Sequence, residues 1–365
     1  MSRTGTLHPA ALALPARLEN SKAVDALVLE HPGRLSTRAS DTPAAPGPGE
    51  VLVRVHRVGV CDTDLQAYRG RHPFFTYPQI LGHELGVEIL EVGTGVENVD
   101  VGDRCAVEPY LSCGHCVACR HGKPNCCAWL QVMGVHVDGG MRRHFVVPAE
   151  KLYASSKLSF DQLALVEPLA VAAHSIRRAA LQPDETVAVV GADARGLAVI
   201  QFAQLAGCRV IAIDSCQQRL KRCREYLGLP EEDLVETTSG DAVDQLLELT
   251  CGELPMTVFD TTGTAGSMLA SFAYPAHGGQ LVFAGLFSGD VSFHDPSFQL
   301  RELSLLASRN AHPQDFEYVL QLMEDGMVDP AAWITHRTTL HDTAALFEAW
   351  AQSDASGLKA MIHLT

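Results

Sequence analysis

The chain has 365 residues, of which 47% are hydrophobic and 19% are charged, and its formal net charge is −15. A chain of this length is expected to form more than one domain, because single cores seldom grow beyond about 250 residues. The composition excludes a disordered protein. The acidic balance argues against nucleic acid or an anionic membrane as the main partner, and no apolar run approaches the roughly 20 residues that span a bilayer.

Residues 1–23 have no uninterrupted apolar core of the signal-peptide type before Arg17 and Glu19. We expect a loose N-terminal extension there, or a start site placed too early. A cytoplasmic location then follows by default. Eleven cysteines would be an unusual disulfide set inside a cell, so metal binding and free buried thiols are the better interpretations.

The first part of the chain has the pattern of short strands separated by glycine and proline. Strands are expected at 24–31, directly after a turn-rich break at 45–50, and at 87–93. No helix-length amphipathic period occurs before about residue 147. Residues 160–180 then favour a helix, which Pro168 is expected to split or kink.

From residue 187 the pattern changes to strands that alternate with helices. A buried strand at 187–190 is followed by a glycine turn, a helix over 196–206 and a second strand that ends at Asp214. Further helices are expected at 217–227, at 241–250 and after Thr264, with strands at 257–260 and 281–286. This alternation predicts a parallel sheet with helices on both faces. Beyond residue 310 we expect one clear helix, a short helix near 344–350 and a last strand.

Residues 187–214 have the form of the first βαβ unit of a dinucleotide-binding fold, in which phosphates sit at the helix N-terminus. The turn is Gly191-Ala192-Asp193-Ala194-Arg195-Gly196, so Asp193 stands where G-x-G-x-x-G has its middle glycine. Asp214 ends the second strand, at the position that binds the adenosine ribose hydroxyls. An acid at this position favours NAD over NADP.

Four cysteines have the spacing C-x2-C-x2-C-x7-C: Cys113, Cys116, Cys119 and Cys127. One loop can wrap four thiolates at this spacing around a tetrahedral zinc, and four protein ligands leave no open position. The pattern therefore indicates a structural zinc. Reduced surface thiols or an iron–sulfur cluster are the alternatives.

A second group combines sulfur, nitrogen and oxygen ligands: Cys61, His83, Glu84 and Glu167. Each residue alone has an ordinary structural explanation. Together, separated by long loops, they fit a catalytic zinc that keeps one position for water or substrate.

These motifs together resemble the zinc-dependent medium-chain alcohol dehydrogenase family, over nearly the whole chain after the N-terminal extension. The matching segments are 61–64, 82–84, the four-cysteine lobe, 167–169, the glycine turn with Asp214, and 308–310. Residues 167–178, EPLAVAAHSIRR, are most similar to the sorbitol and polyol dehydrogenase branch, in which a glutamate replaces the third cysteine ligand.

The resemblance implies an α/β fold of two domains with the active site in the cleft between them. A GroES-like β-rich catalytic domain would comprise residues 24–172 and 310–365, and a Rossmann domain with a doubly wound parallel sheet would comprise 173–309. Family members are usually dimers or tetramers, so a homodimer or homotetramer is expected.

The resemblance also implies a reaction, in which a hydride passes from a secondary alcohol of a polyol, sugar or sugar acid to NAD. Zinc on Cys61, His83 and a carboxylate would lower the pKa of the substrate hydroxyl. Either Glu84 or Glu167 would be the third ligand, and we favour Glu84. The remaining matches assign a proton relay to Thr63, cofactor contacts to Arg219 and Leu286, and a substrate contact to Arg309.

Three positions depart from the family pattern. Gly86 stands one residue closer to Gly82-His83-Glu84 than the glycine of the family pattern does. Asp62 replaces a small glycine. Asp193 adds a charged side chain where the backbone approaches pyrophosphate. One charge pair at ~5 Å and an effective dielectric near 20 costs about 3 kcal/mol, so we expect weak NAD binding. Arg195 could offset this charge or pair with Asp193.

Asp62 and Asp193 keep alternatives open. The main alternative is a cofactor-impaired member of the family that acts as a zinc-bearing scaffold or binding protein. A zinc-using lyase or an NADP reductase is a further possibility, and Asp214 counts against NADP.

Overall fold

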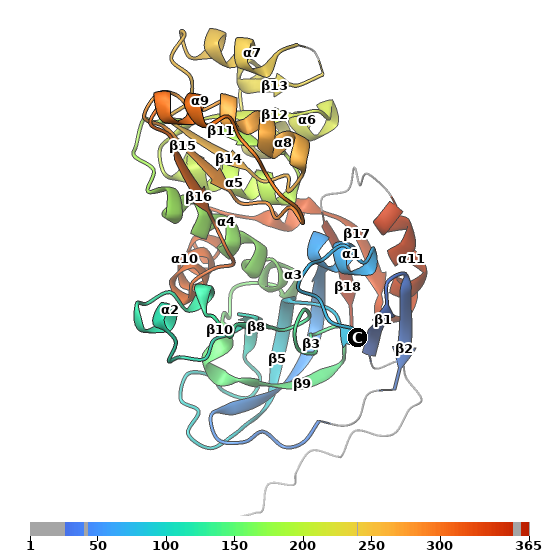
Figure 1. Ribbon diagram of the computed structural model, residues 1–365. Coiled ribbons are helices and arrows are strands. Elements are labelled where there is room, and N and C mark those ends of the chain that lie inside the picture. The colour runs from blue at the N-terminus through green and yellow to red at the C-terminus, as the bar shows by residue number, and fades with distance from the viewer. Residues whose placement is uncertain (1–25, 40–42, 239, 353–358, 365) are drawn as a thin grey trace, which may run out of the picture.

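The computed structural model describes residues 26–39, 43–238, 240–352 and 359–364, which form two lobes (Figure 1). The predicted N-terminal extension, residues 1–23, lies outside the described residues. Within the described ranges, no helix combines the length and the apolar character that crossing a membrane requires.

The first lobe is built on a seven-stranded sheet in the order β10-β6-β5-β3-β18-β17, with β9 paired to β3. Its strands are β3 (Glu50–Val60), β5 (Glu84–Val92), β6 (Arg104–Val107), β9 (His144–Pro148), β10 (Leu152–Ala154), β17 (Ile334–Thr339) and β18 (Lys359–His363). The long strand β3 alternates buried and partly buried residues, as its sequence predicts. Two smaller sheets flank it: β2-β1-β4 (Arg34–Arg38, Ala26–His31, Gln79–Ile80) and β7-β8 (Tyr110–Leu111, Gln131–Val132).

The C-terminal strands return to this first sheet. Strand β18 pairs antiparallel with β3 and parallel with β17, and helix α11 (Leu340–Gln352) lies beside them (Figure 1). The last part of the chain therefore lies within the lobe formed by the first part. This pairing is compatible with the predicted split catalytic domain, whose boundaries stay a prediction.

The second lobe carries a six-stranded parallel sheet in the order β13-β12-β11-β14-β15-β16. Its strands are β11 (Thr186–Val190), β12 (Arg209–Asp214), β13 (Leu234–Glu236), β14 (Thr257–Asp260), β15 (Gln280–Phe283) and β16 (Ser304–Ala307). The helices are α5 (Ala194–Leu205), α6 (Gln217–Leu227), α7 (Ala242–Leu249), α8 (Ala265–Ala270) and α9 (Asp295–Leu300). This order is that of the Rossmann doubly wound fold, so the predicted fold class is confirmed.

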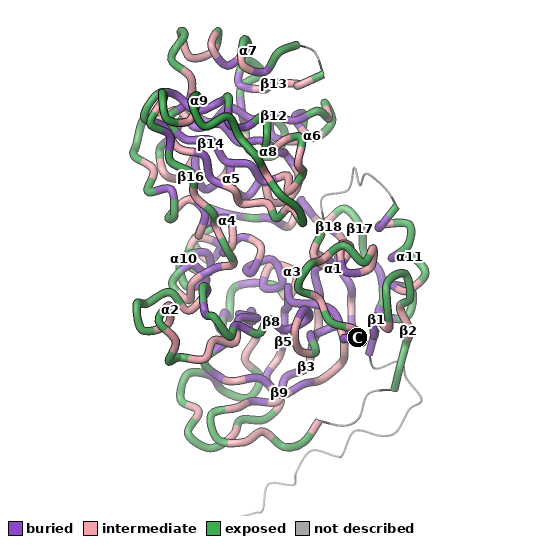
Figure 2. Tube along the Cα trace, in the orientation of Figure 1, coloured by how far each residue is buried: buried purple, intermediate pink, exposed green. Residues whose placement is uncertain are grey.

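Both faces of the parallel sheet are covered, as the apolar run in β11 requires. Val187 and Val189 belong to one core cluster with residues of α5, whereas Ala188 and Val190 belong to another cluster with α7. Figure 2 shows this central strand layer as buried. The cofactor turn therefore starts from a strand that is buried on both faces.

The predicted helix at 160–180 is divided, but not at Pro168. Helix α3 (Phe160–Ala164) ends before Leu165, and α4 (Val166–Ala179) begins directly after it. Pro168 lies in the first turn of α4. Backbone N–H groups there have no intrahelical acceptor, so a proline, which lacks this group, costs the helix no hydrogen bond. Gly86, the early glycine, explains how α3 lies so close to the sheet, since a Cβ there would be 2.3 Å from the Phe160 carbonyl oxygen.

The remaining helices join the lobes or carry site residues. Helix α1 (Asp62–Tyr68) follows β3 without a loop, in a region for which the sequence showed no helix-length period. Helix α2 (Val117–Arg120) lies in the cysteine lobe, and α10 (Pro313–Glu324) lies near α4 at the waist of the molecule (Figure 1).

Candidate active site

Three predicted metal ligands converge in the first lobe. Cys61 is the N-cap of α1 at the end of β3, His83 precedes β5, and Glu84 is the first residue of β5. One ligand atom from each of these residues lies within 4.8 Å of the other two. Gly82 allows this approach with φ +96°, because a Cβ there would lie 2.9 Å from the Met141 side chain. The site thus depends on pairing between β3 and β5.

Glu84 occupies a space that its neighbours leave for its carboxylate. Gly59 pairs with Glu84 across the strands, and a Cβ on Gly59 would lie only 2.0 Å from Glu84 Oε2. Lys359 Nζ donates to Glu84 Oε1 at 2.6 Å, and both side chains are buried. Glu84 Oε2 is buried without a hydrogen-bond partner. One oxygen is therefore paired with an ammonium, and the other is left for a further cation.

The histidine has a carboxylate behind it. His83 Nδ1 and Asp64 Oδ1 lie 3.8 Å apart, and both atoms are buried without hydrogen-bond partners. Burial lowers the pKa of His83, but the charges of Asp64 and Cys61 outweigh burial and raise it well above its usual range. A buried imidazole and the unpartnered Glu84 Oε2 beside a thiol match the donor set of zinc. The carboxylate of Asp64 faces His83 Nδ1, and a carboxylate behind a ligating histidine is the usual support for it.

Glu167 lies in the same cleft but outside the group of three ligands. The Tyr110 hydroxyl donates a hydrogen bond to Glu167 Oε1. Burial raises the pKa of Glu167, and the charge of Glu84 raises it further, while His83 opposes both. The converging ligand atoms thus include Glu84 and not Glu167.

Thr63 and Asp62 begin helix α1 at the edge of this site. Thr63 Oγ1 lies 3.5 Å from Cys61 Sγ, and Thr63 lines the cleft. Asp62 is more than half exposed and lies 3.8 Å from Arg69 Nη1, with Gln66 Nε2 within 3.4 Å of its carboxylate. The unusual acid is thus paired on the helix surface rather than directed at the metal ligands.

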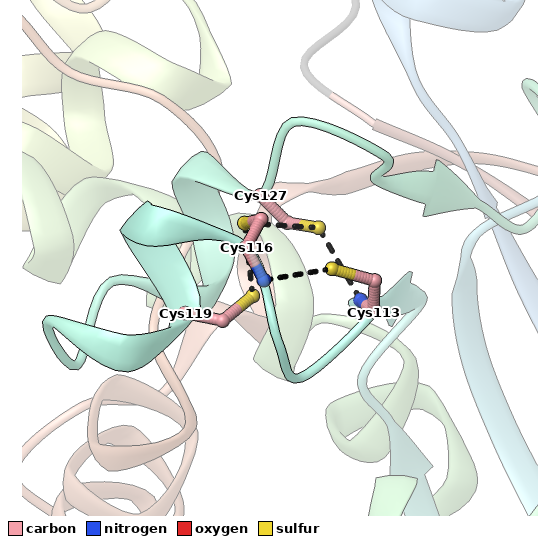
Figure 3. Close-up of side chains that lie close together, drawn as sticks. All are labelled: Cys113, Cys116, Cys119 and Cys127. Atoms are coloured by element: carbon pink, nitrogen blue, oxygen red, sulfur yellow. Dashed lines mark hydrogen bonds between the residues drawn. The ribbon is translucent and has the colours of Figure 1, made fainter.

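The four cysteines of the spacing motif come together as a second metal group (Figure 3). Cys116 Sγ lies 3.5 Å from Cys119 Sγ and 3.9 Å from Cys127 Sγ, near the separation of about 3.8 Å set by tetrahedral zinc–sulfur bonds of about 2.3 Å. Backbone N–H groups lower the pKa of Cys116 to about 6. Cys127 is buried and Cys126 is exposed. The fourth member of the group is therefore Cys127, eight residues after Cys119, as the spacing motif predicts.

The glycine turn is held by contacts that leave its backbone little freedom. Gly191 has φ +95°, and a Cβ there would lie 2.5 Å from Thr261 Oγ1. A Cβ on Gly196 would lie 1.9 Å from the Gly191 carbonyl oxygen. Asp214 Oδ2 accepts the N–H of Ala192 at 2.7 Å, which ties the turn to the end of β12. Arg219 Nη1 lies 3.7 Å from the same oxygen.

The side chain of Asp193 is directed at the helix that follows it. Asp193 is the N-cap of α5 with extended backbone angles, φ −75° and ψ −170°, and its side chain folds back onto the first turn of that helix. The predicted ion pair with Arg195 does not occur among the described residues. Arg195 Nη1 instead lies 3.4 Å from the Thr261 carbonyl oxygen.

One cleft contains both the metal ligands and the cofactor turn. Its volume is about 1370 Å³, above the roughly 1,000 Å³ at which small-ligand pockets usually end. The lining brings together these residues predicted from the sequence: Cys61, Thr63, His83, Glu84, Glu167, Gly191, Asp193, Arg195, Asp214, Arg219, Leu286 and Arg309. Of the remaining turn residues, Ala192 and Gly196 are buried beneath it.

The sequence interpretation missed two buried partners of the site, Lys359 and Tyr110. Lys359 is the first residue of the last strand, and Tyr110 lies in a two-residue strand with no motif. Only the place of Lys359 directly before the apolar residues Ala360, Met361 and Ile362 could have drawn attention, because a buried lysine requires a counter-charge.

The comparisons with known proteins agree with this geometry. Residues 47–157 match the alcohol dehydrogenase GroES-like domain, and residues 194–325 match the zinc-binding dehydrogenase family. L-galactonate-5-dehydrogenase of Escherichia coli (strain K12) is 36% identical over 325 residues, which cover 89% of this chain and 94% of that protein. Sorbitol dehydrogenase of Bacillus subtilis (strain 168) is 28% identical over 323 residues, covering 86% of this chain and 90% of that protein.

A solved structure shows the same fold. It is described as a short chain alcohol dehydrogenase (rspB) from E. coli CFT073 complexed with NADH. It has a TM-score of 0.85 and 28% identity, and the match covers 93% of this chain and 99% of that chain. Together with the sequence relatives, it confirms the predicted family, reaction class and cofactors. The chain belongs to the zinc-dependent medium-chain alcohol dehydrogenase family, in its polyol dehydrogenase branch, and is an alcohol oxidoreductase that uses zinc and a nicotinamide dinucleotide.

Proposed function

We propose that this protein oxidises a secondary hydroxyl of a sugar acid, with NAD as the hydride acceptor. The observation that carries this proposal is the shared cleft, in which Cys61, His83 and Glu84 face the same cavity as the glycine turn. A metal-bound hydroxyl and a dinucleotide could therefore meet in one cleft. Nothing in the site or among the relatives favours the zinc-bearing scaffold.

Cys61, His83 and Glu84 would hold the catalytic zinc, which supplies a Lewis acid that lowers the pKa of the substrate hydroxyl. Support for Glu84 over Glu167 comes from its unpartnered Oε2 and its place among the three converging ligands. Glu167, held by Tyr110, would lie beside the substrate rather than on the metal. Asp64 would fix the ring of His83.

Thr63 would relay the proton of the substrate hydroxyl, accepting it while its own hydroxyl proton passes to solvent in the cleft. Its Oγ1 lies beside the Cys61 sulfur and lines the cleft, so it can donate to one oxygen and accept from another. NAD supplies the hydride acceptor, and the protein has only to position it. Leu286, which is 57% exposed, offers the cleft an apolar contact from the end of β15.

The choice of a sugar acid rests on basic groups in the same cleft. Arg309 and His136 both line it. The Val132 N–H donates to His136 Nδ1 at 3.0 Å, which leaves Nε2 as the N–H of the neutral ring. Burial lowers the pKa of His136, and the nearby charge of Arg309 lowers it further. An arginine beside an N–H donor suits a carboxylate, and a relative is named for L-galactonate.

The preference for NAD rests on Asp214. Its carboxylate is buried at the end of β12, in the cofactor cleft, where a 2′-phosphate would meet a like charge. Arg219 lies beside the Asp214 carboxylate and would contact the adenosine half of the cofactor. NADH is therefore expected to bind more tightly than NADPH, which a competition titration would measure.

We further propose a homodimer or homotetramer in the cytoplasm. The edge strand β16 is largely exposed, and Leu305 on it and Leu300 before it are 40% and 78% exposed. An exposed edge of this kind is a template for pairing with a second chain. Sedimentation equilibrium would test this, and a monomer at micromolar concentration would contradict it. The free thiols and the thiolate-rich metal group support a reducing compartment.

A panel of substrates tests the function directly. The zinc-loaded protein would be incubated with NAD and aldonic acids, neutral polyols or simple secondary alcohols, and NADH absorbance followed. We expect the highest kcat/KM with an aldonic acid. Turnover of neutral polyols at equal or higher kcat/KM would contradict the acid preference, and no turnover of any alcohol by protein with both metal groups filled would contradict the proposed reaction.

A further inference from the structure

The phosphate position of the cofactor turn already holds an anion of the chain itself. Asp193 Oδ1 accepts the backbone N–H of Arg195 and that of Gly196, each at 3.0 Å. These N–H groups belong to the first turn of α5, whose partial positive charge attracts phosphate in dinucleotide folds. A carboxylate therefore satisfies two donors that a pyrophosphate would otherwise use.

The backbone around these two N–H groups is closely packed. Gly191 and Gly196 are in contact at distances that admit no Cβ, and Asp214 holds the Ala192 N–H. The Asp193 side chain is the part of this turn that can rotate, because it lies partly exposed in the cleft. A phosphate must therefore displace it or bind without the two N–H groups.

Arg195 provides a charge that can receive the displaced carboxylate. It lines the same cleft, and its guanidinium lies near several acids. Burial lowers the pKa of Arg195, but the charges of Asp193 and Cys61 outweigh burial and raise it. No ion pair joins Arg195 to Asp193 in the part of the chain that the structure describes, and Arg195 Nη1 donates to the Thr261 carbonyl oxygen at 3.4 Å. Arg195 can therefore exchange this long contact for an ion pair with Asp193 or with a phosphate.

We propose that the Asp193 carboxylate is an internal competitor of the cofactor's pyrophosphate, capping α5 in the cofactor-free protein and leaving its two N–H groups when NAD or NADH binds. The proposal rests on the cofactor site of the proposed function. Asp193 would then set the cofactor affinity in a way that differs from simple steric hindrance. Its side chain stabilises the cofactor-free state of the turn and opposes the state with NAD or NADH bound.

The decisive variant is Asp193→Asn. Asparagine caps helices about as well as aspartate, so α5 keeps its cap while the competing charge is removed. NADH titrated into the zinc-loaded protein, with its fluorescence as readout, should bind at least about tenfold more tightly to the variant, because the carboxylate charge no longer opposes the pyrophosphate. Asp193→Gly removes both charge and cap and should bind more tightly still.

Asp241 offers a matched control in the same lobe. It is the N-cap of α7, where its Oδ1 accepts the Val243 N–H at 2.8 Å, and it does not line the cleft. Asp241→Asn makes the same change of charge and chemistry at a different helix start. We expect it to leave the dissociation constant of NADH unchanged.

Two fragments of the cofactor, ADP-ribose and adenosine, test whether the change in affinity arises at the pyrophosphate. ADP-ribose carries the pyrophosphate and adenosine does not, so Asp193→Asn should strengthen binding of ADP-ribose and leave that of adenosine unchanged in competition with NADH. Equal affinity of wild-type protein and Asp193→Asn for NADH would overturn the proposal. So would a gain shared by Asp241→Asn, an equal gain for adenosine, or no binding of NADH by any of these proteins.

These measurements need no substrate, which separates them from the test of the proposed function. Tighter NADH binding by Asp193→Asn without turnover of any alcohol would contradict only the proposed reaction. Turnover of a sugar acid with no change of NADH affinity in the variant would contradict only the role of Asp193.

Discussion

Lys359 Nζ lies 2.6 Å from Glu84 Oε1, and both side chains are buried beside the metal ligands. The contact joins the last strand of the chain to β5 and leaves Glu84 with one oxygen for the metal. Burial lowers the pKa of Lys359, but the charges of Glu84 and Cys61 outweigh it and raise that pKa. The C-terminal strand therefore takes part in the site electrostatically as well as in the sheet.

Replacing Lys359 by methionine should leave a buried carboxylate without its ammonium. Breaking one partner of a buried pair costs about 3–5 kcal/mol, so the free energy of unfolding in urea should fall by that order in zinc-depleted protein. Bound zinc would compensate part of the charge, and the loss should be smaller in zinc-loaded protein. The double variant Glu84→Gln with Lys359→Met should recover part of it. Unchanged stability of Lys359→Met in both metal states would refute this role of the pair.

Two cysteines near the four-cysteine metal group, Cys119 and Cys126, should respond differently to replacement by serine. Cys119→Ser removes one of four converging sulfurs and should reduce bound zinc by one per chain and lower the free energy of unfolding by several kcal/mol, since structural zinc contributes on the order of 10 kcal/mol to folding. Cys126→Ser changes the exposed cysteine outside the group and should alter neither. Metal analysis and thermal unfolding measure both, and equal behaviour of the two variants would argue against a structural zinc.

Asp161 gives the stability a predictable dependence on pH. It accepts hydrogen bonds from Arg57 and Arg337, each at 2.6 Å, and links α3 to β3 and β17. Burial raises the pKa of Asp161, but the two hydrogen bonds outweigh it and hold that pKa below its usual range. A lowered pKa in the folded state means that the stabilisation is present above the unfolded value of about 3.9 and is lost as pH falls through the folded value.

Asp161→Asn should therefore lower the free energy of unfolding by about 1–3 kcal/mol at neutral pH, the usual contribution of charged hydrogen bonds. The difference from the wild-type protein should shrink below about pH 4. Asp244→Asn, at an exposed position on α7, serves as the control. Urea unfolding at several pH values measures the difference, and a gap that widens in acid would show that the sign is wrong.

Arg309 should distinguish acidic from neutral substrates. If it binds a substrate carboxylate, Arg309→Met should lower kcat/KM for an aldonic acid by roughly 10–100-fold, as expected for a lost charged hydrogen bond. The same variant should change kcat/KM for a neutral polyol much less. Arg178, exposed on α4 outside the cleft, provides the matched control. Equal losses for both substrate types would assign Arg309 to structure instead.

The sequence alone predicts those helices and strands whose ends are marked by neighbouring residues. Helix α6 was predicted at 217–227, where the structure has Gln217–Leu227, because Gly228 follows with φ +69° and ends the helix. Cys61, His83 and Glu84 could be selected as a candidate group because they stand in two short segments, 61–64 and 82–84, that resemble those of the family. The break at Leu165 was not, since no glycine or proline marks it.

Contacts between distant parts of the chain were beyond sequence reasoning. The role of Lys359 depends on β18 pairing with β3, and no local pattern relates residue 359 to residue 84. Asp193 shows a different limit. Its charge was correctly seen as unusual, but the direction of its side chain, back onto the N–H groups of α5, follows from three-dimensional geometry.

The central claim is that Cys61, His83 and Glu84 hold the zinc at which an alcohol is oxidised. Metal analysis of purified Cys61→Ser, run beside an assay of NADH formation from a sugar acid, tests it most directly. The account predicts one zinc per chain instead of two, an intact fold by circular dichroism, and loss of NADH formation. Two zincs per chain with NADH formation at the wild-type rate would contradict it.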